Sequence, residues 1–320
     1  MPVTVRSFAK INLGLAIGPA RPDGFHELRT IYQTIALHDV LTMAAGPGTG
    51  IEIRCPDARV PAGKSNTCYG VAEAVLKTLE LRRKVTITLD KRLPVQGGLG
   101  AGSSNGVATM LGLERALRRR LDPGDRLRIA AGVGSDLPLF LVGGAVLGTG
   151  RGEEVYPLPD LPALPCVLVT PPLAVSTPRA FGDWDDRFGG KLTAERRFDT
   201  MKRFSHAAFA WLASSASGVA VKGGDRAEAL LLDLVRAGIE NDFERVVFPQ
   251  YPELRDMKRA LERLGARFAS LSGSGSTLYG LFDSERKAQQ AAQKIAGEGV
   301  PAVATRTLPR SQYWRQLFKN

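Results

Sequence analysis

Apolar and polar residues alternate along several short segments of the chain, and this spacing predicts β-strands. In Lys84–Asp90 the side chains of Val85, Ile87 and Leu89 fall on one side of an extended backbone, as in a strand with one buried face. The same pattern predicts further strands at Val3–Phe8, Ile11–Ile17, Ile31–Leu37 and Ile51–Arg54.

Other segments repeat their apolar residues at the spacing of a helix. Behind a glycine-rich segment, Val107, Leu111 and Leu117 belong to an apolar face that predicts a helix over Asn105–Leu121. Further helices are predicted at Asn66–Leu79, Thr200–Ser214, Ala227–Ala237, Pro252–Leu264 and Ser284–Gly299, the last of which ends on glycine.

Prolines gather in Val155–Pro165 and interrupt both kinds of pattern. Proline cannot continue a helix interior or donate a hydrogen bond to a sheet. We therefore predict a domain junction here, with one domain at residues 1–160 and a second at residues 161–320.

The second half repeats the mixture of strands and helices. It opens with an apolar strand at Cys166–Pro171, and the polar segment Gly182–Arg197 predicts a loop. Ala266–Asp283 predicts a strand, a glycine turn and a second strand. Because strands and helices alternate in both halves, the chain is predicted to be an α/β or α+β protein.

The composition is that of an ordinary globular protein. Of the 320 residues 44% are hydrophobic and 23% are charged, which excludes general disorder. No apolar run is long enough to span a membrane, and the N-terminus lacks the pattern of a secretory signal peptide. We therefore expect a cytoplasmic protein without a membrane partner. The three cysteines, Cys55, Cys68 and Cys166, are too scattered for a disulfide framework or a zinc site.

The net charge of +11 suggests an anionic partner, either nucleic acid or a phosphate-bearing small molecule. The basic clusters at residues 81–84, 118–120 and 195–197 are not interleaved with aromatic residues, as a surface for single-stranded nucleic acid would be. We interpret these clusters mainly as solvated surface, with the steering of anions as a lesser role.

The segment Lys91–Gly106 carries four glycines within Gly97–Gly102, followed at once by Ser103, Ser104 and Asn105. Glycine tolerates positive φ and close approach of the backbone to a ligand, and a helix start offers unpaired N–H groups. Between a strand and a helix, the segment therefore predicts a phosphate site, with these polar residues capping the helix and facing a phosphate or its Mg²⁺.

Three alternatives to this phosphate site are weaker. A plain tight turn would rarely need four glycines and two serines together. No Gly-Lys-Ser/Thr follows, so the segment is not a Walker A loop. Ser103 stands where a dinucleotide-binding motif would have its third glycine.

These residues resemble a known family. The segment "LPVQGGLGAGSSN", residues 93–105, is similar to the ATP-binding motif of the GHMP small-molecule kinases. "AKINLGL" at residues 9–15 resembles their N-terminal motif, and "SLSGSGSTLYGLF" at residues 270–282 resembles their C-terminal glycine motif. The resemblance implies a two-domain α+β fold, with an N-terminal ribosomal-S5-domain-2-like domain, a C-terminal ferredoxin-like domain and an active site in the cleft between them.

Within the family, the similarity runs over nearly the whole chain to members that phosphorylate the 2-hydroxyl of a cytidyl-diphosphate-linked methylerythritol in the non-mevalonate isoprenoid route. It includes "RPDGFHELRT", "GSDLPLFLVGGAVLGTGRGE" and "ENDFERVVFPQYPELRDMKRAL". This resemblance implies ATP and Mg²⁺ as cofactors, that small molecule as the substrate, no nucleic-acid partner, and a monomer or weak homodimer.

Two residues carry the expected chemistry. By itself, a carboxylate at Asp136 before the apolar run "LPLFLVGGAVL" fits a helix N-cap as well as a catalytic group, and a lone lysine such as Lys10 in an apolar strand is usually a snorkelling residue. The resemblance implies that Asp136 is the general base and that Lys10 lies beside it and orients the reacting hydroxyl.

The resemblance also implies which residues bind ATP. Asn66 and Lys91 would border the adenine, and Ser104 would lie near a phosphate-bound Mg²⁺. The remaining ATP-binding positions are Pro94, Val95, Gln96, Gly97, Gly98, Leu99, Gly100, Ala101, Gly102, Ser103 and Ser104.

A separate set of residues is implied for the cytidyl substrate. His26 would hydrogen-bond the cytosine edge, while Phe25, where many members have tyrosine, and Phe181 would form aromatic walls with Thr177 nearby. Asn12, one strand period from Lys10, would hydrogen-bond the substrate. From local sequence alone, His26 would be interpreted as a surface loop residue.

The sequence leaves two other functions possible. A GHMP kinase for another small alcohol, such as homoserine or mevalonate, would not need the "DGFH" segment together with Phe181. A nucleic-acid-binding protein would give no reason for Lys10, Asp136 and the glycine segment to occur together.

Overall fold

The structure is a computed structural model that describes residues 1–95, 97–189, 201–209 and 239–319. A seven-stranded sheet has the order β11-β1-β2-β4-β3, with β5 paired to β2 and β6 to β5. β3 and β4 are parallel, whereas the other pairs are antiparallel. The strands are β1 (Val3–Ala20), β2 (His26–Gly46), β3 (Gly50–Arg54), β4 (Lys84–Asp90), β5 (Ala145–Thr149), β6 (Glu154–Pro157) and β11 (Phe318–Lys319).

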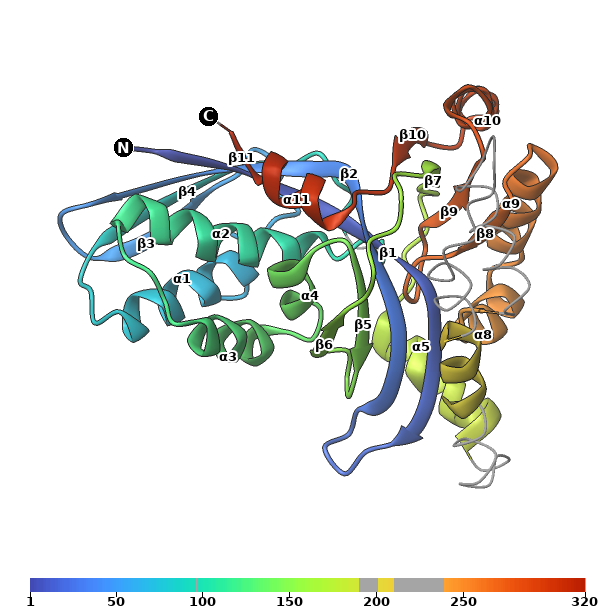
Figure 1. Cartoon of the computed structure of the whole chain (residues 1–320), viewed down its shortest axis with the longest axis horizontal. Coiled ribbons are helices and arrows are strands. Elements are labelled where there is room, and N and C mark those ends of the chain that lie inside the picture. The colour runs from blue at the N-terminus through green and yellow to red at the C-terminus, as the bar shows by residue number, and fades with distance from the viewer. Residues whose placement is uncertain (96, 190–200, 210–238, 320) are drawn as a thin grey trace.

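The two predicted strands at the N-terminus are one strand. β1 runs through both Val3–Phe8 and Ile11–Ile17, and its pairing with β2 shifts register between Phe8 and Lys10 and again between Asn12 and Gly14. Such irregularities bend a strand without ending it, so the polar interruption at Lys10 marks a bulge and not a loop. The resulting β1–β2 ribbon projects far beyond the other strands (Figure 1).

Helices of the first half pack on this sheet. α1 (Thr67–Thr78) lies within the predicted Asn66–Leu79, and Asn66 is its N-cap. α2 (Ala101–Leu117) begins before the predicted Asn105. α3 (Pro123–Val133), which the sequence did not predict, buries only Ile129 and Ala130, so its apolar face is narrow. α4 (Leu137–Val142) is a short apolar helix.

A second, four-stranded sheet has the antiparallel order β10-β7-β9-β8. It confirms the strand–turn–strand prediction for residues 266–283 and the strand predicted at Cys166. The strands of this sheet are β7 (Pro165–Val169), β8 (Phe268–Leu271), β9 (Leu278–Leu281) and β10 (Ala302–Arg306). The helices of this half include α5 (Thr177–Trp184), α8 (Glu244–Gln250), α9 (Pro252–Arg263) and α10 (Glu285–Gly297).

Three predictions of this second half have different outcomes. The loop predicted over Gly182–Arg197 is wrong at its start, because α5 continues to Trp184 and one turn of π-helix follows over Asp185–Gly189. The ring of Trp184 packs on that of Phe188. Residues 201–209 are helical, as predicted for Thr200–Ser214. The helix predicted at Ala227–Ala237 lies outside the described residues.

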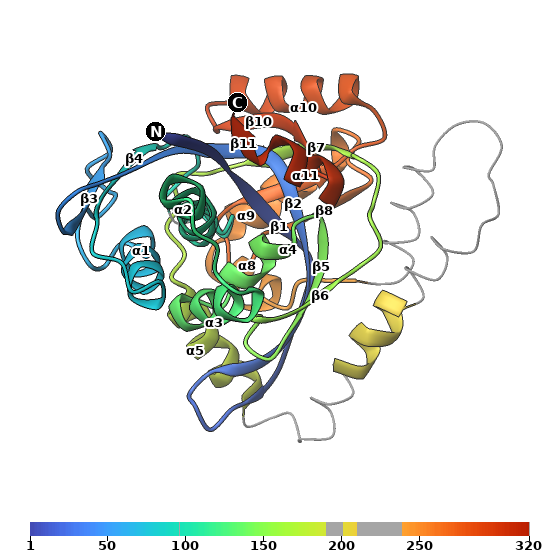
Figure 2. The ribbon, with the colours of Figure 1, turned by 60° about the vertical axis from the view of Figure 1, so that its left-hand side comes forward.

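The chain end returns to the first sheet. α11 (Arg310–Leu317) leads into β11, which pairs with β1, so the two termini lie close together in both views (Figures 1 and 2). The change from one sheet to the other falls between Pro157 and Pro165. The domain division at residue 160 stays a prediction. No helix in the described ranges is long and apolar enough to cross a bilayer.

An apolar cluster joins the two halves. It combines Ile11 and Leu13 of β1 with Leu168 of β7 and Tyr279 of β9, all of which are buried. The Tyr279 hydroxyl also donates to the carbonyl oxygen of Asn12 at 2.7 Å. The middle of β1 is thereby fixed between the sheets, and Lys10 and Asn12 lie on this fixed stretch.

Candidate active site

The glycine segment forms the start of α2. Gly98 and Gly100 have positive φ angles of 75° and 65°, and Gly100 is the N-cap of the helix without any side-chain capping bond. The prediction that Ser103, Ser104 and Asn105 cap the helix is wrong, because the helix begins at Ala101 and includes them. The first-turn N–H groups therefore have no side-chain cap, and this is the arrangement that favours an anion.

Close approach explains two of the glycines. A Cβ on Gly98 would overlap the carbonyl oxygen of Ser272, and the Ser272 hydroxyl donates to the carbonyl oxygen of Gly98 at 2.9 Å. A Cβ on Gly100 would lie 3.1 Å from Cγ of Lys10. The two glycine motifs, one from each half of the chain, thus meet directly, with Lys10 against the first.

Beside this loop lies a pocket of about 360 Å³, which we call the glycine-loop pocket. Asn66 and Lys91, the two residues predicted to border the adenine, both line it. Its other lining residues are Arg59, Val60, Pro61, Ser65, Thr67, Leu89, Pro94, Val95, Gly97, Gly98, Leu99, Gly100, Ala101, Gly102, Ser103 and Asn105. Gln96, also predicted to bind ATP, lies outside the described residues.

Two of the residues predicted to contact ATP already bind other residues of the protein. The ammonium of Lys91 lies 2.7 Å from Asp39, a fully buried carboxylate that also accepts from the backbone N–H groups of Arg92 and Leu93. Ser104 is 2% exposed, and its hydroxyl accepts from the Ser7 hydroxyl at 2.8 Å. The Lys91 ammonium and the Ser104 hydroxyl are therefore already bonded within the protein.

Lys10 and Asp136 come together although they are far apart in the sequence. The Lys10 ammonium lies 3.4 Å from Oδ2 of Asp136 and donates to Oδ1 of Asn12 at 2.7 Å. The Lys10 side chain is 4% exposed, whereas that of Asp136 is 32% exposed. Asp136 precedes α4 but makes no capping hydrogen bond, so its carboxylate is not engaged as a helix cap.

Tyr32 is a member of this cluster that the sequence did not reveal. Its hydroxyl donates to Oδ1 of Asp136 at 3.1 Å. Burial and the nearby Asp136 carboxylate raise the pKa of Tyr32 well above its usual value, so the phenol remains a donor. A lone tyrosine in an apolar strand is typical of a core residue, and only the β1–β2 register, which pairs Tyr32 with Asn12, places it here.

The residues predicted for the cytidyl substrate lie around the β1–β2 turn and α5. The rings of His26 and Phe181 stack with centroids 5.0 Å apart and planes 11° from parallel. Nε2 of His26 is 2.8 Å from Asp185, a partner that the sequence did not indicate. The Thr177 hydroxyl is hydrogen-bonded to that of Ser274 at 2.7 Å.

Phe25 lies apart from this stack. Its side chain is 48% exposed, and the Arg151 guanidinium lies 4.8 Å from the centre of its ring. The structure thus places His26, and not Phe25, against Phe181. Arg151 is a second residue that the sequence analysis did not single out, although it lies in the quoted segment "GTGRGE".

Comparison with known proteins identifies the family. The model for the GHMP kinases N terminal domain matches residues 66–144, and that for GHMP kinases C terminal matches residues 226–301. A protein of Solibacter usitatus named 4-diphosphocytidyl-2-C-methyl-D-erythritol kinase is 40% identical over 294 residues, which cover 92% of this chain and 85% of the relative. The chain belongs to the GHMP kinase family.

Solved structures agree on the fold of this GHMP kinase. A crystal structure of 4-(cytidine 5'-diphospho)-2C-methyl-D-erythritol kinase matches with a TM-score of 0.71 at 29% identity, over 95% of this chain and 98% of the other. A homoserine kinase from Cytophaga hutchinsonii matches with the same TM-score, 0.71, at 19% identity, over 96% and 95%. The α+β fold prediction is confirmed, but the backbone alone does not select the acceptor alcohol.

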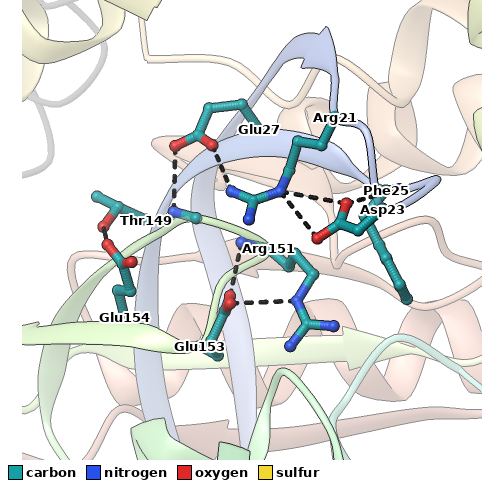
Figure 3. A network of polar contacts seen from close by, with 9 residues as sticks. Arg21, Asp23, Phe25, Glu27, Thr149, Arg151, Glu153 and Glu154 are labelled. Carbon is teal, nitrogen blue, oxygen red and sulfur yellow. Dashed lines mark hydrogen bonds and ion pairs between the residues drawn. The ribbon is translucent and has the colours of Figure 1, made fainter.

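In this GHMP kinase, a polar network holds the β1–β2 turn against the β5–β6 turn (Figure 3). The Arg21 guanidinium pairs with Glu27 at 2.9 Å and with Asp23 at 3.2 Å. Glu27 in turn accepts from the backbone N–H of Gly150 at 3.2 Å. On the other side, Arg151 pairs with Glu153 at 3.1 Å. The turn that carries Phe25 is therefore held by its own ion pairs, by the Gly150–Glu27 hydrogen bond between the two turns, and by the contact of Arg151 with the Phe25 ring.

Proposed function

We propose that this GHMP kinase transfers the γ-phosphoryl group of ATP to the 2-hydroxyl of 4-diphosphocytidyl-2-C-methyl-D-erythritol, in the non-mevalonate route to isoprenoid precursors. The names of its relatives from Solibacter usitatus and Moorella thermoacetica support this substrate. The observation that carries the proposal is the Lys10–Asp136 pair, at 3.4 Å, next to the positive-φ glycines that start α2. Cytoplasmic location and a monomer or weak homodimer remain predictions.

The glycine-loop pocket would hold ATP with its phosphates against the first turn of α2. The uncapped N–H groups and the positive end of the helix dipole favour anionic oxygens there. Asn66 and Lys91 would border the adenine. Because the Lys91 ammonium already pairs with Asp39, its contact with the base would come from its methylene stem.

Transfer needs a base for the hydroxyl proton and a fixed acceptor. In the proposed step the 2-hydroxyl oxygen attacks the γ-phosphorus, the bond from phosphorus to the β,γ-bridging oxygen breaks, ADP leaves, and Asp136 takes the proton. Lys10 holds the carboxylate through Oδ2 and Tyr32 holds it through Oδ1. Asn12 fixes Lys10 in turn, with its own amide donating to Thr30 at 2.8 Å.

The cytidyl group would be recognised at the β1–β2 turn. His26 offers a hydrogen-bond donor or acceptor to the edge of the cytosine, and Phe181 offers an aromatic face to its ring. Stacking of a base on an aromatic side chain contributes about 1–3 kcal/mol. Entry of the cytosine would replace the contact between these two rings by contacts with the base. Thr177 lies beside Phe181 on α5, and the exposed ring of Phe25 is available as a second wall. Arg151 beside Phe25 supplies a cation for the substrate diphosphate.

Mg²⁺ would accompany ATP in this reaction and neutralise phosphate charge. The described ranges contain no group of three or more His, Cys, Asp or Glu side chains that could hold a metal ion. A kinase Mg²⁺ typically keeps several waters and binds phosphates with one or two protein groups, which fits such a sparse site. Ser104 does not fit as a ligand while its buried hydroxyl is bonded to Ser7, so we assign it no step.

The proposal is tested by turnover of the purified protein with ATP and Mg²⁺. We expect ADP release with the cytidyl diphosphate substrate, and the phosphorylated product identified by ³¹P NMR at the 2-position. Homoserine and mevalonate serve as controls for the acceptor and should give at least a hundredfold lower kcat/KM. Turnover of either control at a rate equal to or above that of the cytidyl substrate would overturn the substrate assignment.

A further inference from the structure

A second hollow lies at the opposite end of α2 from the glycine loop, and we call it the arginine groove. Its volume is about 720 Å³. Along α2, the last residue that lines the glycine-loop pocket is Asn105 and the first that lines the groove is Leu111, so about 9 Å of helix separates the two linings. The groove is lined by Leu111, Glu114, Arg115, Arg118, Arg119, Arg120, Arg126, Trp314 and Phe318, none of which lines the glycine-loop pocket.

The groove carries a large excess of positive charge. Its single acid, Glu114, is buried and pairs with Arg126 at 3.0 Å, so these two charges cancel. The other four arginines of the lining form no ion pair with an acid anywhere in the described part of the chain. Five arginines against one glutamate leave a net charge of +4 in one hollow.

Helix electrostatics account for part of this cluster only. Arg115 and Arg118 lie in the last turn and at the C-cap of α2, where the dipole favours cations. Arg119 and Arg120 follow the helix end and are exposed. The mutual repulsion of four guanidinium groups is relieved when an anion binds among them.

The tertiary structure adds aromatic rings that the sequence did not place near these arginines. Pairing of β11 with β1 brings Phe318 under Arg115, whose guanidinium carbon lies 3.2 Å from the ring centre. Trp314 donates its Nε1–H to the carbonyl oxygen of Val142 at 3.0 Å and is 38% exposed. Arg115 is thus already oriented by stacking, and the indole is fixed with part of its surface open.

We propose that the arginine groove binds a compact polyphosphate, a chain of three or more phosphates that is either free or carried by a nucleotide. Arginine is the side chain best suited to bidentate phosphate contacts. The groove volume falls within the range of small-molecule sites, about 300–1,000 Å³. A nucleic-acid strand would need a basic track that follows its backbone, whereas here the charge is gathered in one hollow.

Calorimetric titration of the full chain with inorganic tripolyphosphate tests the proposal. The glycine-loop pocket can also take phosphates, so the number of sites is measured as well as the affinity. The variant Arg118→Glu/Arg119→Glu/Arg120→Glu should lose one binding site or weaken it at least tenfold. The control Arg82→Glu/Arg83→Glu/Lys84→Glu makes the same change of charge at another exposed cluster and should keep that site within twofold.

Equal weakening in both triple variants would overturn the proposal, because the effect would then be one of net charge. So would an oligothymidylate that binds the groove while tripolyphosphate does not. A parallel titration with ATP distinguishes the two sources, since a nucleotide site would prefer ATP and a polyphosphate site would not. The milder variant Arg119→Gln/Arg120→Gln should still weaken the binding of tripolyphosphate in the groove at least threefold. Thermal melting checks that this variant is folded.

Discussion

Lys10 and Asp136 meet within the first half of the molecule, whereas Phe25 lies on the exposed turn between β1 and β2. Lys10 is 3% exposed and is held by Asn12 and Asp136 at once. Phe25 is 48% exposed, and its turn is held by ion pairs near the surface, such as Arg21 with Glu27. The proposed base is therefore held by a buried lysine, whereas the turn beside the proposed cytidyl site is held by exposed ion pairs. His26 itself is 6% exposed and is held by its stack on Phe181.

This difference implies different responses to mutation. A buried polar group that loses its partner is expensive, because the remaining group stays desolvated. Exposed ion pairs are worth about 0–1 kcal/mol and are screened by salt. Substitutions near Asp136 should therefore change kcat strongly, whereas those at the turn should change KM for the cytidyl substrate moderately.

The largest effect is expected for Asp136→Asn. Loss of the general base should lower kcat by about a thousandfold, within the range of about 10²–10⁴ for such groups. ATP affinity, measured by calorimetry, should stay within twofold. Asp90→Asn, which removes an exposed carboxylate paired with Arg92, is the matched control and should leave kcat unchanged. A variant that keeps a tenth of wild-type turnover would remove Asp136 as the base.

Gly98→Ala should come next, with about a hundredfold loss in kcat/KM for ATP. The added Cβ is strained at a φ of 75° and would overlap the Ser272 carbonyl, so the loop must move. Gly132→Ala is the control, because Gly132 is an exposed residue of α3 outside the pocket and its Cβ would meet nothing within 4 Å. Steady-state kinetics with ATP as the varied substrate separate the two. Equal effects would mean that the close approach at Gly98 does not matter.

His26→Ala should raise KM for the cytidyl substrate by about thirtyfold and KM for ATP by less than twofold. The stacking and edge contact that it would lose correspond to about 1–3 kcal/mol. Initial rates with each substrate varied in turn give both values. A similar rise in the two KM values would place His26 outside the cytidyl site.

Tyr32→Phe isolates the hydrogen bond to Asp136. A hydrogen bond to a charged group contributes about 1.5–3 kcal/mol, so we expect kcat to fall about tenfold with little change in either KM. Tyr69→Phe, at a half-buried tyrosine of α1 that packs against the core of the first half, is the control. A fall in thermal stability without a fall in kcat would make Tyr32 a core residue only.

The smallest effect is expected for Arg21→Gln at the surface network. KM for the cytidyl substrate should rise about twofold at low salt, and the difference from wild type should shrink at 0.5 M NaCl as screening weakens the ion pairs. A salt-independent change larger than tenfold would show that the turn depends on Arg21 as strongly as the catalytic pair depends on burial.

The sequence predicted the longer helices, the central strands and the glycine loop, because these depend on neighbours within a few residues. It gave no prediction for the short elements β5, β6, β10, β11, α4, α8 and α11, whose apolar patterns span only a few residues. It missed α3, whose buried face has only two residues, and it split β1 at a bulge. It also put the start of α2 four residues too late, since Gly100 caps the helix through its backbone and offers no side-chain signal. The resemblance to GHMP kinases supplied Lys10 and Asp136 as a pair, which no local pattern could do.

By itself, the sequence determined the mixed α and β class, the longer helices and strands, the phosphate-favouring loop and, through its motifs, the family. The tertiary structure alone decided that Tyr32 contacts Asp136, that His26 stacks on Phe181, and that Trp314 and Phe318 line a groove with arginines of α2. The physical reason is the distance along the chain between the residues that interact. Local patterns follow from backbone geometry over one or two turns, whereas strand register and the packing of distant segments fix which side chains meet.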